Sequence, residues 1–136
     1  MAKVLRVGSA NVGSMSTRYA EVVNISAKRR LDFCCLQETR WRGQSSRCIK
    51  GDGVIYKCFW KGCKKGTAGV GVLVAEKWIN SVIEVRKISE RLMVLRVSVG
   101  ERVLNLLTVY APQVGRLSEE KAEFFIVLYY VGKGAG

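Results

Sequence analysis

Leu31-Asp32-Phe33-Cys34-Cys35-Leu36-Gln37-Glu38-Thr39-Arg40-Trp41 is the stretch that decides the fold. Its apolar run from Leu31 to Leu36 predicts a short strand buried in a sheet, over about Asp32 to Gln37. The run ends with a single carboxylate, Glu38, just past the core strand. Carboxylate oxygens are natural ligands for hard divalent cations such as Mg²⁺. The stretch therefore predicts a core strand with a candidate metal ligand at its end.

A strand, helix, strand unit leads into this run. Val4 to Val7 is predicted as a first strand, residues 11–15 as a loop, and Ser16 or Thr17 as the cap of a helix that runs to about Arg30. The apolar face expected for this helix consists of Ala20, Val23 and Ala27. The two strands would lie parallel, buried in a sheet that the helix covers.

The middle of the chain is predicted to be rich in β-strands. Val54 to Trp60 and Gly69 to Ala75 form an expected hairpin with a glycine- and lysine-rich tip. Three more extended segments are expected at Ser81 to Lys87, Leu92 to Val99 and Arg102 to Tyr110. Gly100-Glu101 suits a two-residue turn between the last two, and Ser118 followed by two glutamates is a good helix start.

Composition limits the class of protein. The chain has 136 residues, 49% of them hydrophobic, which predicts one domain or part of one. Its 23 Lys+Arg against 11 Asp+Glu give +12, so nucleic acid is the first partner to expect and an acidic membrane surface the second. The odd number of cysteines, five, favours reduced thiols in a nuclear or cytoplasmic protein that is not secreted. The apolar run Phe124 to Val131 is too short to span a bilayer, so no membrane segment is expected.

Four short motifs follow one another in a recognisable order. They are Ser9-Ala10-Asn11-Val12, Leu36-Gln37-Glu38-Thr39-Arg40-Trp41, Gly69-Val70-Gly71-Val72 and Val109-Tyr110-Ala111-Pro112-Gln113. In order and spacing the chain resembles the endonuclease/exonuclease/phosphatase family, and within it the endonuclease domains of LINE-type retrotransposons and craniofacial development protein 2-like sequences. Arg91-Leu92-Met93 and Arg102 to Asn105 strengthen that likeness, which covers about Val4 to Phe124.

The resemblance implies a partial four-layer α/β sandwich with a mixed sheet and flanking helices. Residues 1–123 would be the N-terminal portion of such a domain, and residues 124–136 a divergent apolar and then glycine-rich tail. A helix face, a buried strand and an unrelated tail all remain open for Phe124 to Val131. We expect the chain to supply one sheet and part of its cover, which would leave an apolar sheet face exposed and favour self-association.

The resemblance also implies a site. Asn11 would organise the metal and phosphate network, Glu38 would bind Mg²⁺, and Tyr110 would contact the scissile phosphate of DNA. Each residue also has a structural interpretation: a loop asparagine, a solvated strand end and a core aromatic. The order in which the three residues occur along the chain favours the site over these structural interpretations.

Two departures from the family pattern weaken that site. Ala10 stands where the family has tryptophan, and Gly13 where the retrotransposon subgroup has arginine. The Gly-Asp-Phe-Asn and Ser-Asp-His motifs, which act on the attacking water and the phosphate, are absent, because the chain has two aspartates, Asp32 and Asp52, and no histidine. The sequence therefore predicts a truncated Mg²⁺-dependent phosphodiesterase with absent or very weak DNA-nicking activity.

Two other functions are compatible with the sequence. A non-catalytic nucleic-acid-binding module would use basic residues beside aromatics, namely Arg40, Trp41, Arg42, Trp60, Lys61, Lys64 and Lys65. A zinc module would use Cys48, Cys58 and Cys63, whose spacings fit no usual pattern of paired ligands. Cys34 and Cys35 are expected to be core thiols.

Overall fold

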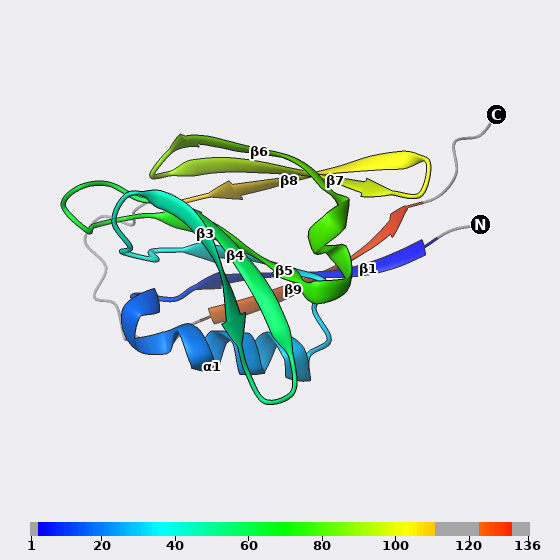
Figure 1. Cartoon of the computed structure of the whole chain (residues 1–136), viewed down its shortest axis with the longest axis horizontal. Coiled ribbons are helices and arrows are strands. Elements are labelled where there is room, and N and C mark those ends of the chain that lie inside the picture. Colours follow the sequence, from blue (N-terminus) through cyan, green and yellow to red (C-terminus); the bar gives the residue numbers. More distant parts are fainter. Residues whose placement is uncertain (1–2, 111–122, 132–136) are drawn as a thin grey trace.

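The computed structural model describes residues 3–110 and 123–131 (Figure 1). Its larger sheet has six strands in the order β3-β4-β5-β2-β1-β9. These strands are β1 (Lys3–Asn11), β2 (Phe33–Gln37), β3 (Gln44–Lys50), β4 (Ile55–Lys61), β5 (Val70–Ala75) and β9 (Glu123–Val131). β1 and β2 are parallel, and the other neighbouring pairs are antiparallel. The smaller sheet is an antiparallel meander of β6 (Val82–Ser89), β7 (Leu92–Val99) and β8 (Arg102–Val109).

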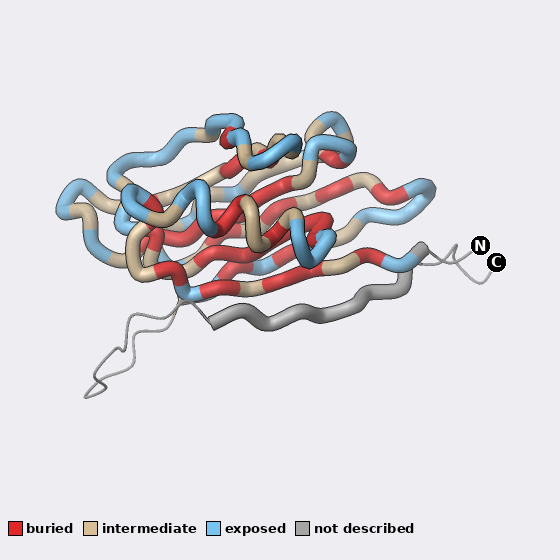
Figure 2. Tube along the Cα trace, turned by 90° about the horizontal axis from the view of Figure 1, so that it is seen from below, coloured by how far each residue is buried: buried red, intermediate tan, exposed pale blue. Residues whose placement is uncertain are grey.

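The elements form three layers. The smaller sheet lies on one face of the larger sheet, and helix α1 (Met15–Lys28) lies on the other (Figure 1). One core cluster lies between the sheets and includes Phe33, Val72 and Leu95, and a second packs α1 against the larger sheet through Val22, Val23 and Leu36 (Figure 2). The expected layered α/β fold with a mixed sheet is confirmed.

The second sheet corrects one expectation. The face of the larger sheet was predicted to be exposed, but Val70, Val72 and Val74 are each 0% exposed beneath the smaller sheet. The reason is that β7, the central strand of the smaller sheet, alternates strictly in burial, so this sheet has an apolar face that packs on the larger sheet. The chain thus carries parts of both sheets.

Helix α1 begins earlier than predicted. It starts at Met15 after Ser14, whose side chain makes no capping hydrogen bond, rather than after Ser16 or Thr17. Met15 is fully buried, and its backbone N–H donates to Thr39 O at 2.9 Å, so packing and this bond fix the start of the helix. The predicted face is wrong at Ala20, which is exposed, because the buried stripe runs through Val22, Val23 and Ser26.

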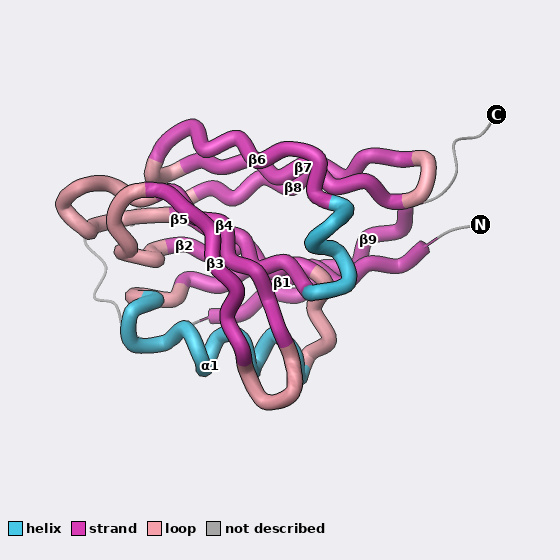
Figure 3. The backbone as a smooth tube through the Cα atoms, in the orientation of Figure 1, coloured by secondary structure: helices cyan, strands magenta, loops and turns pink. Residues whose placement is uncertain are grey.

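Two elements were not predicted. The edge strand β3 is exposed at most positions and buries only Ile49, so it lacks the periodicity that indicates a strand. The 3₁₀ helix η1 (Glu76–Ser81) connects the two sheets (Figure 3). Its Trp78 is buried and donates Nε1–H to the Asp32 carboxylate at 2.9 Å.

The remaining expectations stand as follows. The β4–β5 hairpin is confirmed, and so is the Gly100-Glu101 turn, in which Gly100 has φ +62° and Val99 pairs with Arg102. Phe124 to Val131, for which a helix face, a buried strand and an unrelated tail remained open, lies in strand β9, which is antiparallel to β1. The helix expected at Ser118 lies outside the described residues, and the boundary at residue 123 stays a prediction.

Neither helix of the described ranges is long and apolar enough to cross a membrane. The nuclear or cytoplasmic location stays a prediction.

Candidate functional site

The site is built on a turn that follows β2. Glu38 and Arg40 both adopt φ +56°, a left-handed conformation that is unfavourable for residues other than glycine. Thr39 between them is fully buried. Backbone hydrogen bonds fix the turn: Thr39 N to Gly69 O at 3.2 Å, Arg40 N to Ala68 O at 2.8 Å, and Met15 N to Thr39 O at 2.9 Å. Contacts with α1 and with the start of β5 thus determine where Glu38 lies.

The backbone geometry at Gly69 explains why the Gly-Val-Gly motif begins with glycine. It has φ +100°, and a Cβ at this position would collide with Thr39 Oγ1. Its N–H donates to Glu90 O at 3.0 Å, which also ties the turn to the smaller sheet. Only glycine provides both this φ and this close approach.

The three residues predicted from the motifs lie together. Asn11 ends β1 and pairs with Gln37 in the parallel ladder, which puts it beside Glu38; it is a strand residue rather than the predicted loop residue. Asn11 Nδ2 lies 3.4 Å from Glu38 Oε1, and the Tyr110 hydroxyl donates to the same oxygen at 3.0 Å. Arg40 Nη2 lies 3.5 Å from Glu38 Oε2. The Glu38 carboxylate therefore joins residues from three separate parts of the chain.

Tyr110 directly follows the last strand of the smaller sheet. Its backbone N–H donates to Arg91 O at 2.9 Å, just after the end of β8. Burial raises the pKa of its phenol, and the hydrogen bond to Glu38 and the negative charge of Glu38 raise the pKa further. The phenol therefore stays protonated at neutral pH and acts as a hydrogen-bond donor.

Arg91 is a residue that the sequence did not assign to the site. Its guanidinium lies 5.9 Å from the centre of the Tyr110 ring, within cation–π range. The Arg91-Leu92-Met93 motif was a signal for the family subgroup, but it gave no indication of this contact. With Arg40, it gives the site two cationic groups.

The donor set suits Mg²⁺ in part. The Glu38 carboxylate is a hard ligand, and because Asn11 directs Nδ2 at Glu38, Oδ1 is the amide atom available to a metal. Mg²⁺ in proteins commonly keeps several waters and uses one or two carboxylates, so this pair fits a weakly held, largely hydrated ion. The described residues contain no group of three or more His, Cys, Asp and Glu side chains that could hold a metal.

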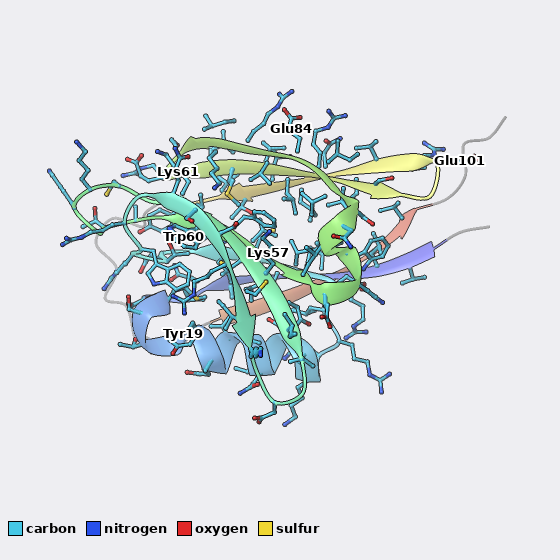
Figure 4. All side chains as sticks on the ribbon, in the orientation of Figure 1. Tyr19, Lys57, Trp60, Lys61, Glu84 and Glu101 are labelled. Atoms are coloured by element: carbon cyan, nitrogen blue, oxygen red, sulfur yellow. The ribbon has the colours of Figure 1, made fainter. Side chains whose placement is uncertain are left out.

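The predicted nucleic-acid-binding residues extend from this site to the tip of the β4–β5 hairpin. Trp41 and Trp60 are in ring contact at 4.7 Å, and Trp60 Nε1 donates to Arg42 O at 3.2 Å. Lys61 ends β4, and Lys64 and Lys65 are exposed in the turn that follows. Figure 4 shows Trp60 and Lys61 toward the same end of the molecule as Tyr19 of α1.

The cysteines have different environments. Cys34 and Cys35 are buried, as expected of core thiols, and so is Cys58 on β4. Cys48 is exposed on β3, and Cys63 is half-buried in the turn after β4.

No family model matches the chain, and no curated protein is similar to it in sequence. Solved structures do resemble it. The 3'-5' exonuclease NExo from Neisseria meningitidis is 20% identical over 78% of this chain and 41% of that chain, with a TM-score of 0.53. The endonuclease domain of TRAS1, a telomere-specific non-LTR retrotransposon, is 19% identical over 79% of this chain and 45% of that chain, with a TM-score of 0.53. The AP endonuclease LMAP from Leishmania major is 11% identical over 84% of this chain and 42% of that chain, with a TM-score of 0.55.

This chain therefore spans less than half the length of the nucleases that it matches. At these identities the likeness concerns the fold. It agrees with the order of the sequence motifs that contain Asn11, Glu38 and Tyr110. The chain has the fold of the endonuclease/exonuclease/phosphatase superfamily.

Proposed function

We propose that this chain carries the metal- and phosphate-binding half of a Mg²⁺-dependent phosphodiesterase site that acts on DNA, as in the nicking endonucleases of non-LTR retrotransposons. The observation that supports it is the meeting of Asn11, Glu38 and Tyr110 at one carboxylate, from β1, the turn after β2 and the end of β8. A structure of NExo with a product DNA hairpin supports DNA as the partner class.

Each residue of the site would have a separate role. Glu38 and the Asn11 amide oxygen would hold Mg²⁺, which when bound supplies charge that polarises phosphoryl oxygens. The protonated Tyr110 hydroxyl would donate to a phosphate oxygen. Arg40 and Arg91 would attract the DNA backbone and orient the phosphate beside Glu38.

We further propose that cleavage by this chain alone is absent or very weak. The chain has no histidine, and both aspartates have other positions: Asp32 bonds Arg6 and Trp78, and the backbone of Asp52 bonds the Asn24 side chain. Neither is available to orient an attacking water at Glu38. Because groups of a catalytic site act as a unit, loss of one part removes most of the rate.

Metal binding and plasmid nicking test the two parts of this proposal separately. Titration with Mn²⁺ as a paramagnetic substitute should show a weak site that is lost in Glu38→Gln. The matched control is Glu84→Gln, since Glu84 is also a carboxylate paired with arginine, but on β6. Equal metal binding by wild type and Glu38→Gln would refute the metal site. Robust Mg²⁺-dependent nicking that is lost in Glu38→Ala would refute the proposed inactivity.

A non-catalytic nucleic-acid-binding module is the second candidate. The contact between Trp41 and Trp60 beside Arg42 and Lys61 favours it, because aromatic and cationic groups together suit bases and phosphates. Steeply salt-dependent binding without nicking would support this module. No binding at low salt would remove it.

Self-association is proposed through β8. This outer strand of the smaller sheet exposes Val103 by 44%, Leu107 by 59% and Val109 by 57%. Beside it a groove of about 440 Å³ reaches Val7 on β1 and Cys35 on β2. A second copy could add a strand at this edge and cover the apolar side chains. Sedimentation should show dimers that Leu107→Lys abolishes; a wild type that is monomeric at high concentration would refute this.

A further inference from the structure

One side-chain cluster lies next to the candidate metal site without belonging to it. The Arg47 guanidinium lies 5.2 Å from the centre of the Tyr19 ring and 5.2 Å from the centre of the Trp41 ring. Trp41 in turn contacts Trp60, with ring centres 4.7 Å apart. The four residues come from α1, the turn before β3, β3 and β4. We call Tyr19, Arg47, Trp41 and Trp60 the aromatic ladder.

The aromatic ladder has a supported side and an open side. Trp41 and Trp60 pack against the core between α1 and the larger sheet. Tyr19 remains 38% exposed and Arg47 is exposed. A cluster that served only to attach β3 to α1 would gain more by burying these two side chains. The planar groups at its outer end therefore remain accessible to a ligand.

The electrostatic surroundings of the ladder favour an anionic ligand. The sequence from Arg40 to Gly51 contains Arg40, Arg42, Arg47 and Lys50 but no aspartate or glutamate. The lysines of the β4–β5 turn follow Trp60 closely in the chain. Flat aromatic or guanidinium surfaces surrounded by cations are the combination that binds unpaired nucleotides, since bases stack on the planes while phosphates meet the charges.

We propose that Tyr19, Arg47 and Trp41 form a stacking subsite for an unpaired nucleotide of a single-stranded nucleic acid. This inference rests on the proposed nucleic-acid partner and not on the metal. Trp41 lies three residues after Glu38 in the same turn. A strand whose phosphate lies at Glu38 would therefore place a neighbouring nucleotide at the ladder.

Fluorescence anisotropy with a labelled oligothymidylate tests the subsite. A length of about 12 nucleotides suits a site of this size, and about 50 mM salt with EDTA removes any contribution of a metal. Tyr19→Ala should weaken binding about 5- to 100-fold, the usual loss for one stacked base. Tyr19→Phe, which keeps the ring, should bind as the wild type does. Circular dichroism confirms that each variant is folded.

Substitutions at Arg47, Lys50 and Tyr19 separate stacking from simple charge. Arg47→Ala should weaken binding more than Lys50→Ala, which removes one charge from the last residue of β3. Arg47→Lys keeps the charge but loses the plane, so it should also bind less tightly than the wild type. Tyr19→Ala should leave the salt dependence unchanged, because no phosphate contact is lost.

The outcomes decide the inference. Binding by Tyr19→Ala equal to that of the wild type would overturn it, and so would equal effects of Arg47→Ala and Lys50→Ala. Equal losses by Tyr19→Ala on the oligothymidylate and on a hairpin duplex would overturn the preference for unpaired nucleotides. A wild type that does not bind the oligonucleotide would overturn the subsite altogether. Loss of metal binding in Glu38→Gln with unchanged oligonucleotide binding leaves the subsite supported and concerns only the metal site.

Discussion

Replacing Asp32 by alanine should destabilise the fold strongly, because this carboxylate joins three elements. Asp32 is 7% exposed just before β2. Its Oδ2 accepts the Arg6 backbone N–H of β1 at 2.8 Å, and its Oδ1 accepts Trp78 Nε1–H of η1 at 2.9 Å. The Lys77 ammonium lies 3.2 Å from the same Oδ1.

The size of this loss of stability follows from the hydrogen bonds and the ion pair that the substitution removes. In Asp32→Ala the donors of Arg6 and Trp78 lose their acceptor, at about 1–3 kcal/mol each. The Lys77 side chain is 71% exposed, so its ion pair adds at most about 1 kcal/mol. The expected loss is about 2–7 kcal/mol, a large part of the roughly 5–15 kcal/mol that stabilises a typical domain.

Urea unfolding followed by tryptophan fluorescence measures this loss. Lys77→Ala is the control and should cost less than about 1 kcal/mol. Asp32→Asn keeps one acceptor oxygen and should fall between the two. An Asp32→Ala variant within about 0.5 kcal/mol of the wild type would refute the reasoning, and so would a Lys77→Ala variant that is equally destabilised.

Four further predictions concern the site and the β4–β5 hairpin. Gly69→Ala should lower the free energy of unfolding by about 1–3 kcal/mol because of its left-handed φ and should reduce Mn²⁺ binding through displacement of the turn; unchanged values for both would contradict the account. The raised pKa of Tyr110 should appear as a late step in an absorbance titration compared with Tyr110→Phe, and Glu38→Gln should move that step to lower pH, because a negative charge is lost. Iodoacetamide near pH ~8 should alkylate Cys63 well before Cys58. The reason is that a hydrogen bond with a threonine hydroxyl lowers the pKa of Cys63, whereas burial raises the pKa of Cys58 to about 12. Equal labelling of the two thiols in the folded protein, measured by peptide mass spectrometry, would be inconsistent with the fold. Glu38→Gly should leave the free energy of unfolding within about 1 kcal/mol of the wild type while removing metal binding, since glycine relieves the unfavourable φ; a large loss of stability would show that Glu38 serves the fold.

The part of the site that local patterns predict is the carboxylate of Glu38 at the end of a buried strand. A buried run after a strand and helix indicates two parallel strands, whose carboxyl ends meet at one edge of the sheet. The pairing of Asn11 with Gln37 shows that the two strand ends do meet, but the site role of Asn11 came from the resemblance to the family. Tyr110 lies 72 residues beyond Glu38 and on the other sheet, so only the family motif brought it to the site.

What the sequence did not reveal depends on contacts between distant segments. The exposed edge strand β3 has no apolar alternation, yet it supplies Arg47 to the aromatic ladder. Arg91 reaches the site because its carbonyl accepts the Tyr110 N–H, a link between the residue before β7 and the residue after β8. Such positions follow from sheet pairing and not from local periodicity, so residue patterns within one segment give no signal for them.

The two carboxylates at the ends of β2 differ in how tightly the fold holds them. Asp32 accepts hydrogen bonds from a buried tryptophan and a partly buried backbone group, so water cannot readily replace its partners. Glu38 contacts an exposed asparagine, an arginine whose side chain is 53% exposed and, at 3.0 Å, the hydroxyl of Tyr110, and its own side chain is 20% exposed. The contacts with the asparagine and the arginine add little to stability, while the left-handed backbone at Glu38 costs of the order of 1–2 kcal/mol. The left-handed backbone at Glu38, which the buried Thr39 follows directly, fits the metal-binding role that we propose for this residue.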